Sequence, residues 1–483
     1  RYDSLLRGTP GRAVVARDNV GRPIPGETIV VDPPRAGGEV VLTLDMDLQE
    51  IARQALREAI AESGARGGDV LVTDPSTGEI LALVSLRDGR PGSLSAINSP
   101  YEPGSTLKPF TVAGLLEHGR GALSDTVDVE GGVWRVAGRT LHDVSAHDRI
   151  TLADALRVSS NVGVAKAARA LSPGEQYENL RDFGFGVPTG IELPGEVGGV
   201  LRRPDGWTAQ SRASLAIGYE VSVTPLQMAM AYGAIANGGL LLEPRLVKEV
   251  RDARGRTVER FGTRTVRRVL RPRVARRIAG VLEQVVEDGS GTRARLATFR
   301  VAGKSGTSRA YDPDGGYRPG DYYASFAGFF PAEDPQLVIF VKLERPRNGA
   351  YYGGSVAAPV TRATMEAALA ARSTPLDRFR LLRTTRERRP APEAPVVRFA
   401  SSPVDPPPAP LVEEQGDGVR PSSVALPDMT GLPVRVAARR LHALGLRVTR
   451  EGRGDITATL PAPGTRVAPG DTVRLRSHGG GGG

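Results

Sequence analysis

The sequence predicts an α/β (α+β) domain of roughly 340 residues, a linker, and then a second, small α+β domain. Two observations lead to this prediction. Apolar runs typical of strands lie near both ends of the long segment, and helical periodicity dominates the part between them, about 105–290. Proline then becomes frequent between 390 and 421, and a globular pattern returns over 424–477. Strands at both ends of a segment, with helices between them, are typical of one sheet covered by helices.

The elements of the large domain follow in order. Residues 1–36 are rich in Gly, Pro and Arg and are interpreted as the end of a preceding module. A helix is predicted at about 47–63 because apolar residues recur on one face: Leu48, Ile51, Ala52, Ala55, Leu56 and Ile60. Two apolar runs within 69–86 flank a Pro-Ser-Thr-Gly turn and predict a hairpin. Further strands are predicted at about 299–307, 322–330 and 336–344, and a closing helix at about 356–371.

The C-terminal part divides at its changes in composition. Residues 376–423 are predicted to be a Pro- and Arg-rich linker, with the run DPPPAP near its middle. Residues 424–477 are predicted to be globular. They begin with a short amphipathic helix that carries Val434, Ala437, Leu441 and Leu444, and strands broken by PAPG and APGD turns follow. Residues 478–483 form a Gly-rich tail.

Composition excludes several classes of function. The chain of 483 residues has no cysteine, which excludes disulfides, thiol chemistry and cysteine-ligated zinc. No run approaches 18 apolar residues, the length of a membrane-spanning helix. The net charge of +10 comes from arginine. Its densest run, RFRLLRTTRERR at 378–389, has one aromatic residue and is interpreted as a solvated face or the start of the linker rather than a nucleic-acid site.

Lysine is rare and therefore informative. Only five lysines stand among the 64 basic residues, and one of them, in YEPGSTLKPF, follows Ser105 by three positions. Residues i and i+3 share a helix face, so Ser105 and Lys108 meet if a helix begins near Gly104. A neutral lysine can take the proton of a serine nucleophile, whereas arginine cannot. The alternative is that Ser105 only caps a helix and Lys108 faces solvent, and the pair alone does not decide between the two.

Two further segments carry residues of the same chemistry. VSSNVGVAK holds Ser159, Ser160 and Asn161 between two helical runs, where the simplest local interpretation is a helix N-cap. RVAGKSGTSRA holds Lys304, Ser305, Gly306 and Thr307 on a predicted strand. Gly306 removes a side chain at a point where a ligand or a helix needs close approach.

In this order, Ser-x-x-Lys, Ser-x-Asn and Lys-Ser-Gly-Thr resemble the motifs of the penicilloyl-serine transferases. Within that group the chain resembles the class B penicillin-binding proteins, which are monofunctional peptidoglycan transpeptidases. The flanks YEPGSTLKPF, SSNVGVAK, GYEVSVTPLQMAMAYGAIANGG and GKSGT carry the resemblance over about 37–372, and the transpeptidase domain is predicted to span residues 37–375. Residues 424–477 resemble a single PASTA domain, a tail of division- or sporulation-type members. Residues 1–36 then match the C-terminal remnant of the family's N-terminal pedestal domain.

The resemblance implies a penicillin-binding transpeptidase fold, with a central antiparallel sheet flanked by helices. It implies that Ser105 attacks the D-Ala–D-Ala carbonyl and forms an acyl-enzyme. Lys108 would be the base, with its charge disfavoured by burial and by nearby Lys304. Ser159 would relay the proton to the leaving amine, and Asn161 would bind the substrate amide.

The same resemblance assigns the strand motif to binding. Lys304 and Thr307 would hold the terminal carboxylate, with Ser305 and Gly306 beside the substrate. The backbone N–H groups of Ser105 and Thr307 would form the oxyanion hole. An amine from a neighbouring stem peptide then resolves the ester, and no cofactor or metal is required.

The implied setting is the extracytoplasmic face of the bacterial membrane, with an N-terminal anchor absent from this chain. The implied partners are peptidoglycan stem peptides as D-Ala–D-Ala donor and amine acceptor, β-lactams as inhibitors, and a membrane glycosyltransferase or divisome protein. No nucleic-acid partner is expected, and septal wall synthesis is the expected role.

Two alternatives stay open at this point. One is a D,D-carboxypeptidase or β-lactamase-type hydrolase of the same fold, with Glu175 or Glu178 positioning a water. The other is a wall-binding or β-lactam-sensing protein, in which the PASTA-like unit docks on wall fragments.

Several single residues are interpreted more plainly. His142 and His147 are expected to be loop residues rather than metal ligands, and Trp134 to pack in the core. Tyr219 and Glu220 stand where many family members have Gln-Gly, which leaves the shape of that loop open.

Overall fold

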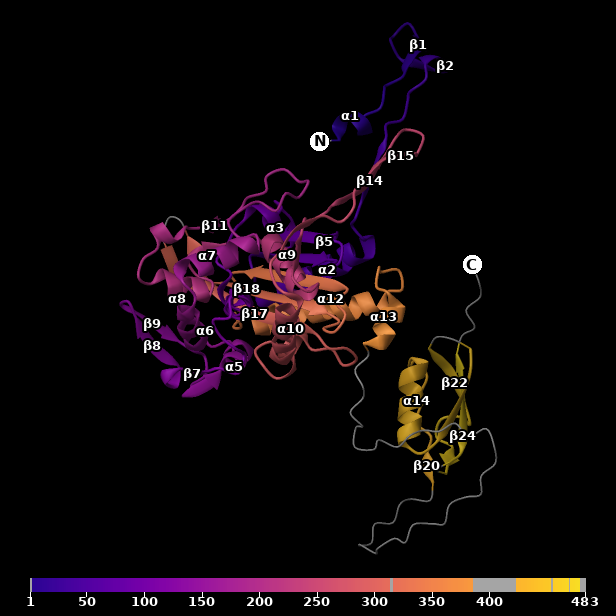
Figure 1. The fold of residues 1–483 in the computed structure, drawn as a ribbon. Helices are drawn as coiled ribbons and strands as arrows, with labels where there is room; N and C mark the ends of the chain where they lie inside the picture. The colour runs from indigo at the N-terminus through magenta and orange to yellow at the C-terminus, as the bar shows by residue number, and fades with distance from the viewer. Residues whose placement is uncertain (1, 313–315, 385–422, 453–454, 469, 478–483) are drawn as a thin grey trace, which may run out of the picture. The chain divides into compact units, whose positions relative to one another are not determined.

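A computed structural model describes residues 2–312, 316–384, 423–452, 455–468 and 470–477. The chain divides into two compact units, residues 1–391 and 392–483 (Figure 1). Most of the predicted linker, residues 385–422, and the predicted Gly tail lie outside the described residues. Among the residues that are described, no helix has both the length and the apolar character needed to cross a bilayer.

The first unit is built on a six-stranded antiparallel sheet in the order β17-β18-β19-β4-β5-β6. The predicted hairpin and the three later strands are its members, which confirms the expected sheet. β17 is an outer strand, so one of its two edges has no strand partner among the described residues. The strands span β4 (Gly67–Thr73), β5 (Ile80–Arg87), β6 (Arg90–Pro91), β17 (Ala302–Asp312), β18 (Gly316–Phe330) and β19 (Leu337–Glu344).

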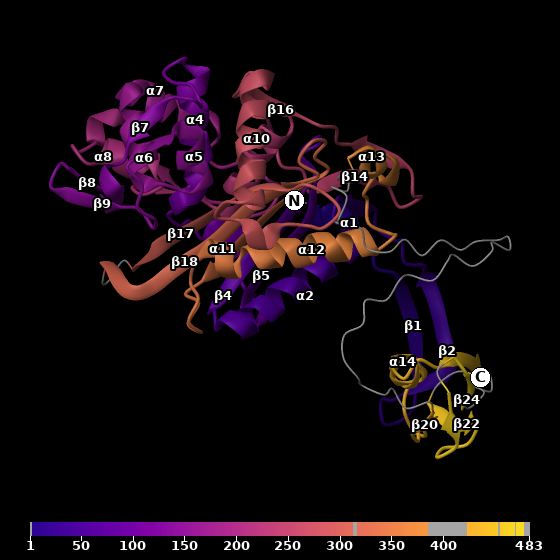
Figure 2. The ribbon, with the colours of Figure 1, turned by 90° about the horizontal axis from the view of Figure 1, so that it is seen from below.

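Alternation along these strands makes two cores, one on each face of the sheet. Leu71 and Phe340 belong to a core shared with α4 (Lys108–Glu117), α9 (Pro225–Ala236) and α10 (Pro272–Glu287). Val70 and Val341 belong to the opposite core, shared with α2 (Met46–Ser63) and α12 (Ala358–Ala370). Figure 2 shows α4 and α10 on one side of the sheet and α2 and α12 on the other. Helices therefore flank the sheet on both sides, as predicted.

The predicted helix at 47–63 is α2. Asp45 caps its N-terminus by accepting a hydrogen bond from the Leu48 amide, and Gly64 ends it in a left-handed conformation. The predicted apolar face is buried except for Ile51, which is only half-buried. The predicted closing helix is α11 (Gly353–Val356) followed by α12.

Short strand pairs interrupt the region predicted to be mainly helical. They include β8 (Val133–Val136) with β9 (Arg139–His142), and Trp134 on β8 is buried in a small core, as predicted. The other pairs are β7 (Thr126–Asp128) with β10 (Arg149–Thr151), β11 (Val200–Leu201) with β12 (Val221–Ser222), and β13 (Leu240–Leu242) with β16 (Thr265–Arg268). The helix α3 (Ser95–Asn98) precedes these strands, and the helices among them are α5 (Leu152–Arg157), α6 (Asn161–Ala167), α7 (Pro173–Asp182) and α8 (Ser211–Ala216).

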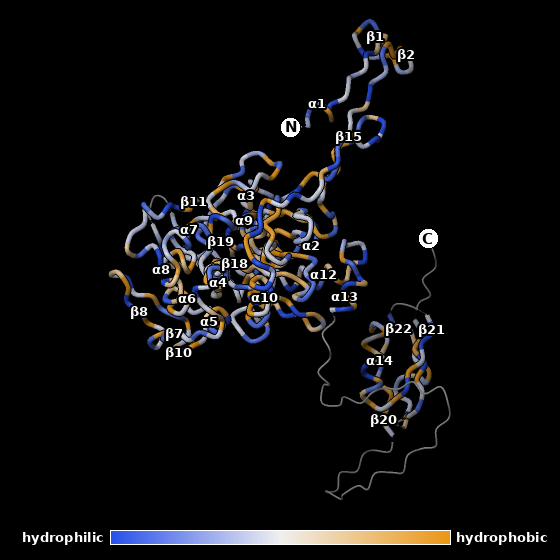
Figure 3. The backbone as a smooth tube through the Cα atoms, viewed as in Figure 1, coloured by the Kyte–Doolittle hydropathy of each residue, from blue (hydrophilic) through white to orange (hydrophobic). Residues whose placement is uncertain are grey.

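The N-terminal residues form α1 (Asp3–Leu6) and a hairpin of β1 (Arg12–Arg17) and β2 (Pro23–Asp32). Apolar side chains of this hairpin are exposed, such as Ile29 at 71% and Val30 at 59%, and Figure 3 shows hydrophobic positions along it. β3 (Glu39–Leu42) pairs with β14 (Val247–Arg251), which pairs with β15 (Thr257–Arg260). The hairpin thus adds little to the core of this unit.

The predicted linker begins too early. Residues 376–384 carry α13 (Arg378–Arg383), and Leu376 and Leu381 are buried in the core shared with α2 and α12. Asp377 caps α13, and Arg380 forms an ion pair with Asp334. Leu376 lies just before the dense arginine run and Leu381 lies within it, and because both are buried this segment belongs to the first unit.

The second unit is a small α+β fold, as predicted. β24 (Thr472–Ser477) pairs in parallel with β21 (Arg447–Glu451) and antiparallel with β22 (Ile456–Leu460). α14 (Val434–Ala443) packs on these strands and buries Ala437 and Leu441. β20 (Val424–Ala425) pairs with β23 (Arg466–Val467).

Candidate active site

Ser105 lies in a 3₁₀ turn, Gly104–Leu107, that leads directly into α4. The predicted helix start near Gly104 is confirmed in position, although its first turn is 3₁₀ rather than α. Residues i and i+3 eclipse each other in a 3₁₀ turn, so Ser105 and Lys108 stand on the same side. Pro109 lies in the first turn of α4, where its missing N–H removes no helical bond.

The three sequence motifs meet at the hydroxyl of Ser159. Lys108 is fully buried, and its Nζ donates to the Ser159 carbonyl at 2.6 Å and to Asn161 Oδ1 at 2.7 Å. The same nitrogen lies 3.2 Å from Ser159 Oγ. Lys304, also fully buried, lies 2.8 Å from Ser159 Oγ through its Nζ. The Ser159 hydroxyl therefore lies between two amines.

Burial governs the charge of both amines. Desolvation lowers the pKa of Lys108 to about 7, and the charge of Asp143 opposes the shift. Desolvation also lowers the pKa of Lys304 well below its usual value, and the neighbouring Lys108 adds to the effect. A neutral Lys108 can donate two N–H groups to the Ser159 carbonyl and Asn161 and keep its lone pair free. The burial of Lys108 and the lowering of its pKa agree with the sequence expectation of a lysine that can be uncharged at neutral pH.

Ser159 adopts a backbone conformation that is unusual for a residue with a side chain, with φ at 64°. A left-handed conformation costs about 1–2 kcal/mol for such a residue. Ser160 follows and caps α6 by accepting a hydrogen bond from the Gly163 amide at 2.8 Å. The local N-cap interpretation is therefore right for Ser160, while Ser159 is directed between the two amines. Strained backbone of this kind is common at functional sites.

Asp143 supports this turn and could not be identified from the sequence. Its carboxylate accepts hydrogen bonds from the amides of Asn161 at 2.5 Å and Val162 at 2.9 Å and from the Ser160 hydroxyl. Asn161 in turn donates through Nδ2 to the His142 carbonyl at 2.8 Å. The only signal was an acidic residue in LHDVSAHD, a segment without periodicity.

Gly306 on β17 allows the turn that carries Ser105, the predicted nucleophile, to lie against the strand. A Cβ at this position would lie 2.7 Å from Ser325 Oγ, 2.8 Å from Thr106 Cγ2 and 2.9 Å from the Pro103 carbonyl. The predicted close approach is confirmed, and the approaching element is the turn that carries Ser105. Beyond it, Thr307 Oγ1 accepts a hydrogen bond from the Gly353 amide at 3.0 Å.

A cleft of about 530 Å³ opens beside these residues. Its walls include the predicted site residues Ser105, Ser159, Asn161, Ser305, Gly306 and Thr307. Four tyrosines and two arginines also line it: Tyr219, Tyr322, Tyr351, Tyr352, Arg293 and Arg309. None of the described residues that line the cleft is Asp or Glu. Lys108 and Lys304 are buried and do not line the cleft, but both form hydrogen bonds with Ser159, which does.

The two glutamates of the hydrolase alternative lie elsewhere. Glu175 pairs with Arg120 at 2.7 Å and caps α7 together with Ser172. The Arg120 hydrogen bond, followed by the Ser172 amide, lowers the pKa of Glu175 to about 2. Glu178 is exposed on the same helix, and neither residue lines the cleft. Their positions give no support to a water-activating role.

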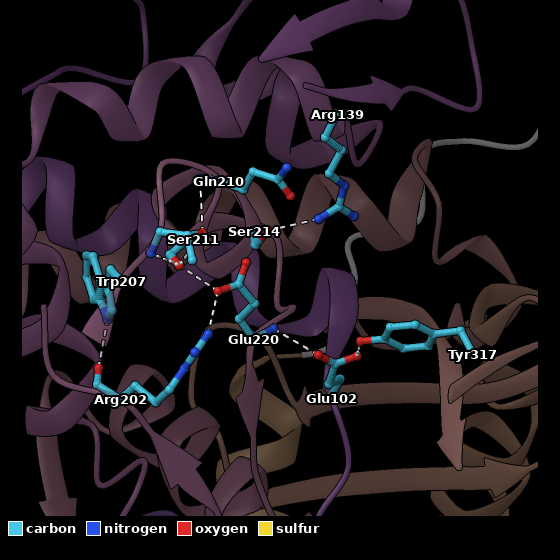
Figure 4. Close-up of polar contacts among 10 residues, drawn as sticks. Glu102, Arg139, Arg202, Trp207, Gln210, Ser211, Ser214, Glu220 and Tyr317 are labelled. Carbon is cyan, nitrogen blue, oxygen red and sulfur yellow. Dashed lines mark hydrogen bonds and ion pairs between the residues drawn. The ribbon is translucent and has the colours of Figure 1, made fainter. Parts of the chain in front are cut away.

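The loop at 218–220, whose shape the sequence left open, lies against the nucleophile turn. The Gly104 amide donates to the Gly218 carbonyl at 3.0 Å, and a Cβ on Gly218 would lie 2.1 Å from the Gly104 carbonyl oxygen. Glu220 has a φ of 60°, and its carboxylate accepts hydrogen bonds from Arg202 and Ser211, both at 2.6 Å (Figure 4).

A serine three residues before a buried lysine whose pKa is lowered to about 7, in such a cleft, is the arrangement of a serine acyltransferase. Residues 68–366 match the family model described as the penicillin binding protein transpeptidase domain, and residues 424–477 match the PASTA domain. The chain therefore belongs to the penicillin-binding protein transpeptidase family and carries a PASTA domain.

Named relatives agree with this assignment. The chain is 34% identical over 78% of its length to the probable peptidoglycan D,D-transpeptidase PbpC of Pseudomonas aeruginosa, and covers 66% of that protein. It is 30% identical over 98% of its length to the stage V sporulation protein D of Bacillus subtilis, and covers 70% of it. The solved transpeptidase domain of penicillin-binding protein 3 from Burkholderia pseudomallei matches with a TM-score of 0.62 and 33% identity, over 68% of this chain and 95% of that one.

Proposed function

We propose that this protein is a serine D,D-transpeptidase that cross-links peptidoglycan stem peptides through an acyl-enzyme on Ser105. The observation that carries the proposal is the burial of Lys108 beside Ser105, with a pKa lowered to about 7 by desolvation. An amine that is substantially neutral at neutral pH can take the proton of a serine hydroxyl. The family, and the name of the Pseudomonas relative as a probable peptidoglycan D,D-transpeptidase, support the same reaction.

The proposed acylation uses Ser105, Lys108 and Ser159 in turn. Ser105 Oγ forms a bond to the carbonyl carbon of the penultimate D-Ala, and its proton passes to Lys108 Nζ. The C–N bond to the terminal D-Ala then breaks, and the leaving amine receives a proton through the Ser159 hydroxyl. This hydroxyl is suited to the relay because it lies within 3.2 Å of Lys108 and 2.8 Å of Lys304. An acceptor amine then attacks the ester, forms the new amide and returns the proton to Ser105.

Binding groups stand on the strand side of the cleft. Lys304 and the Thr307 hydroxyl would hold the terminal carboxylate, whose negative charge would favour the protonated form of Lys304. The N–H groups of Ser105 and Thr307 would stabilise the oxyanion, each contributing about 3–4 kcal/mol. The second N–H of Asn161 Nδ2 is suited to the substrate amide, and Ser305 and Gly306 lie along the peptide.

The composition of the cleft argues against β-lactamase-type hydrolysis. That reaction uses a glutamate to position a deacylating water, and the cleft lining holds no carboxylate among its described residues. β-lactams would therefore leave a long-lived adduct, while the choice between an acceptor amine and a water at the natural acyl ester is decided by product analysis. A β-lactam sensor or wall-binding protein would show the adduct without transfer.

We propose that the protein works on the extracytoplasmic face of the membrane. A membrane glycosyltransferase or divisome protein would supply the glycan strands during septal synthesis. Sporulation is a second candidate setting, because the Bacillus relative with that name aligns with 98% of the chain.

The experiment is intact-mass detection of a penicilloyl adduct on the peptide that contains Ser105. We expect one adduct per chain, absent in Ser105→Ala. Incubation with a D-Ala–D-Ala donor and an amine then separates the mechanisms, because transfer gives the amide product and hydrolysis gives the free acid. A chain without an adduct contradicts the proposal.

A further inference from the structure

The carboxylate of Glu102 joins three segments three residues before the proposed nucleophile. Its Oε2 accepts a hydrogen bond from the Tyr317 hydroxyl at 2.6 Å, and its Oε1 accepts one from the Glu220 amide at 2.8 Å (Figure 4). The Ser308 hydroxyl donates to its backbone carbonyl at 2.6 Å. Glu102 thus connects the nucleophile turn with the β17–β18 hairpin and with the loop at 218–220.

The partners of Glu102 are themselves held in place. Glu220 is fixed by Arg202 and Ser211, and its left-handed backbone directs its N–H toward Glu102. Ser308 is buried on β17, one residue after Thr307. Displacement of Glu102 would therefore move the turn relative to the strand that forms the opposite wall of the cleft.

Glu102 itself does not line the cleft, whereas Ser105 and Ser308 do. Burial raises its pKa, and the hydrogen bonds from Tyr317 and the Glu220 amide oppose that shift, as does Arg139. The negative charge of Glu220 acts in the same direction as burial. A partly buried carboxylate with both oxygens engaged by the protein is suited to holding structure rather than to contacting substrate.

We propose that Glu102 is a positioning residue for acylation, and that Tyr317 acts through it. Its side chain fixes the turn that carries Ser105 against the 218–220 loop and the β17–β18 hairpin. It thereby sets the position of the Ser105 hydroxyl relative to Lys108 and to the Thr307 amide. This inference rests on the proposed acyl transfer at Ser105.

Three variants separate the contacts. Glu102→Ala removes both side-chain hydrogen bonds. Glu102→Gln keeps an oxygen for the Glu220 amide and offers an N–H to the Tyr317 oxygen, so both contacts survive without charge. Tyr317→Phe removes one contact and keeps the ring. Tyr311→Phe is the matched control, because Tyr311 faces Tyr317 across the hairpin with ring centroids 5.4 Å apart and lines no part of the cleft.

The test is rapid-mixing acylation by a chromogenic β-lactam, fitted for the noncovalent dissociation constant and the acylation rate constant separately. Displacement of a reacting group by about 1 Å can cost about 100-fold in rate. We expect Glu102→Ala to lower the acylation rate constant by about 30- to 100-fold, and Tyr317→Phe by about 3- to 10-fold. We expect Glu102→Gln and Tyr311→Phe to stay within about threefold of the starting protein, with dissociation constants similar throughout.

A purely structural role would instead reduce the labelled fraction and leave the rate constant of that fraction unchanged, which would overturn the proposal. Equal loss in Glu102→Gln and Glu102→Ala would also overturn it, because charge rather than position would then matter. If Glu102→Ala does not fold, Tyr317→Phe against Tyr311→Phe decides by the same criterion. Absence of any adduct on the unmodified protein would instead refute the proposed function, and the inference with it.

Discussion

Lys342 and Asp69 form a fully buried ion pair, with Nζ 2.9 Å from Oδ2 and exposed fractions of 1% and 0%. Burial acts to lower the pKa of Lys342, but Asp69 and Glu344 outweigh it, and the pKa is raised. Lys108 and Lys304 are buried as deeply and shift in the opposite direction. The direction of the shift is decided by the presence or absence of a paired carboxylate. The same side chain is thus structural in one place and chemically reactive in another.

Replacement of Lys342 should be costly for stability. Lys342→Met leaves Asp69 buried with only the hydroxyls of Ser85 and Ser95 as donors. Removal of one partner of a buried pair costs about 3–5 kcal/mol. We expect a decrease of that size in the free energy of unfolding, measured by denaturant titration. Lys248→Met, at an exposed lysine, is the control, and a loss below about 1 kcal/mol at Lys342 would contradict the expectation.

Replacement of Lys108 should stop acylation. Loss of a general base costs about 10²–10⁴ in rate. We expect Lys108→Met and Lys108→Arg to be equally impaired in β-lactam acylation, because arginine stays charged and cannot accept the proton. Lys166→Arg, on neighbouring α6 and paired with Glu130, should retain the normal rate. Substantial activity of Lys108→Arg would show that only positive charge is required.

The acylation rate should depend on pH through Lys108. The reactive form is the neutral amine, so the rate rises with pH and falls about tenfold per unit below the pKa. Since the pKa of Lys108 is lowered to about 7, we expect the midpoint of the rise near that value. The apparent midpoint belongs to the coupled pair of Lys108 and Lys304. A rate that is flat between pH 5 and 9 would rule out a titrating lysine base.

The charge of Asp143 should set the position of that midpoint. Asp143 raises the pKa of Lys108 against the effect of burial, so its loss should lower that pKa further. We expect Asp143→Asn, which keeps an oxygen for the amides of Asn161 and Val162, to move the midpoint to lower pH. Asp148→Asn, at an exposed aspartate in the same segment, should leave it unchanged. A shift to higher pH would contradict the electrostatic account.

A side chain at Gly306 should separate the nucleophile turn from β17. The Cβ of an alanine would lie within 2.9 Å of atoms in Ser325, Thr106 and Pro103. We expect Gly306→Ala to lower the acylation rate strongly while helical content stays near normal by circular dichroism. Gly280→Ala is the control, because nothing lies within 4 Å of its Cβ, and alanine in a helix interior favours folding by up to about 1 kcal/mol.

Periodicity was sufficient to predict α2, because that helix buries one regular face. The β4–β5 hairpin and the later strands were predictable for another reason: strands buried on both faces are continuous apolar runs, and turn residues bound them. The meeting of Ser105, Ser159 and Lys304 was expected from the resemblance, since spacing alone does not bring distant segments together. The role of Gly306 was predicted because only a missing side chain permits such close approach.

Other features of the fold and the site could not be predicted, because they have no recognisable pattern in the sequence. Asp143 and Glu102 act through contacts with distant backbone amides, and neither contact has a local signature. The buried Leu381 was hidden among arginines, and Leu376 stands alone between Pro375 and Asp377, so neither belongs to a visible apolar period. The left-handed Ser159 looked like an ordinary cap because its neighbour Ser160 is one.

The outer position of β17 has a consequence for what the cleft can accept. A strand whose free edge faces a ligand recognises it through main-chain groups that every amino acid possesses. A stem peptide and a β-lactam would then bind to the same main-chain groups of β17, provided that each presents an extended amide. The range of ligands that the cleft accepts would in that case follow from the outer position of β17 in the sheet, and not from any particular side chain.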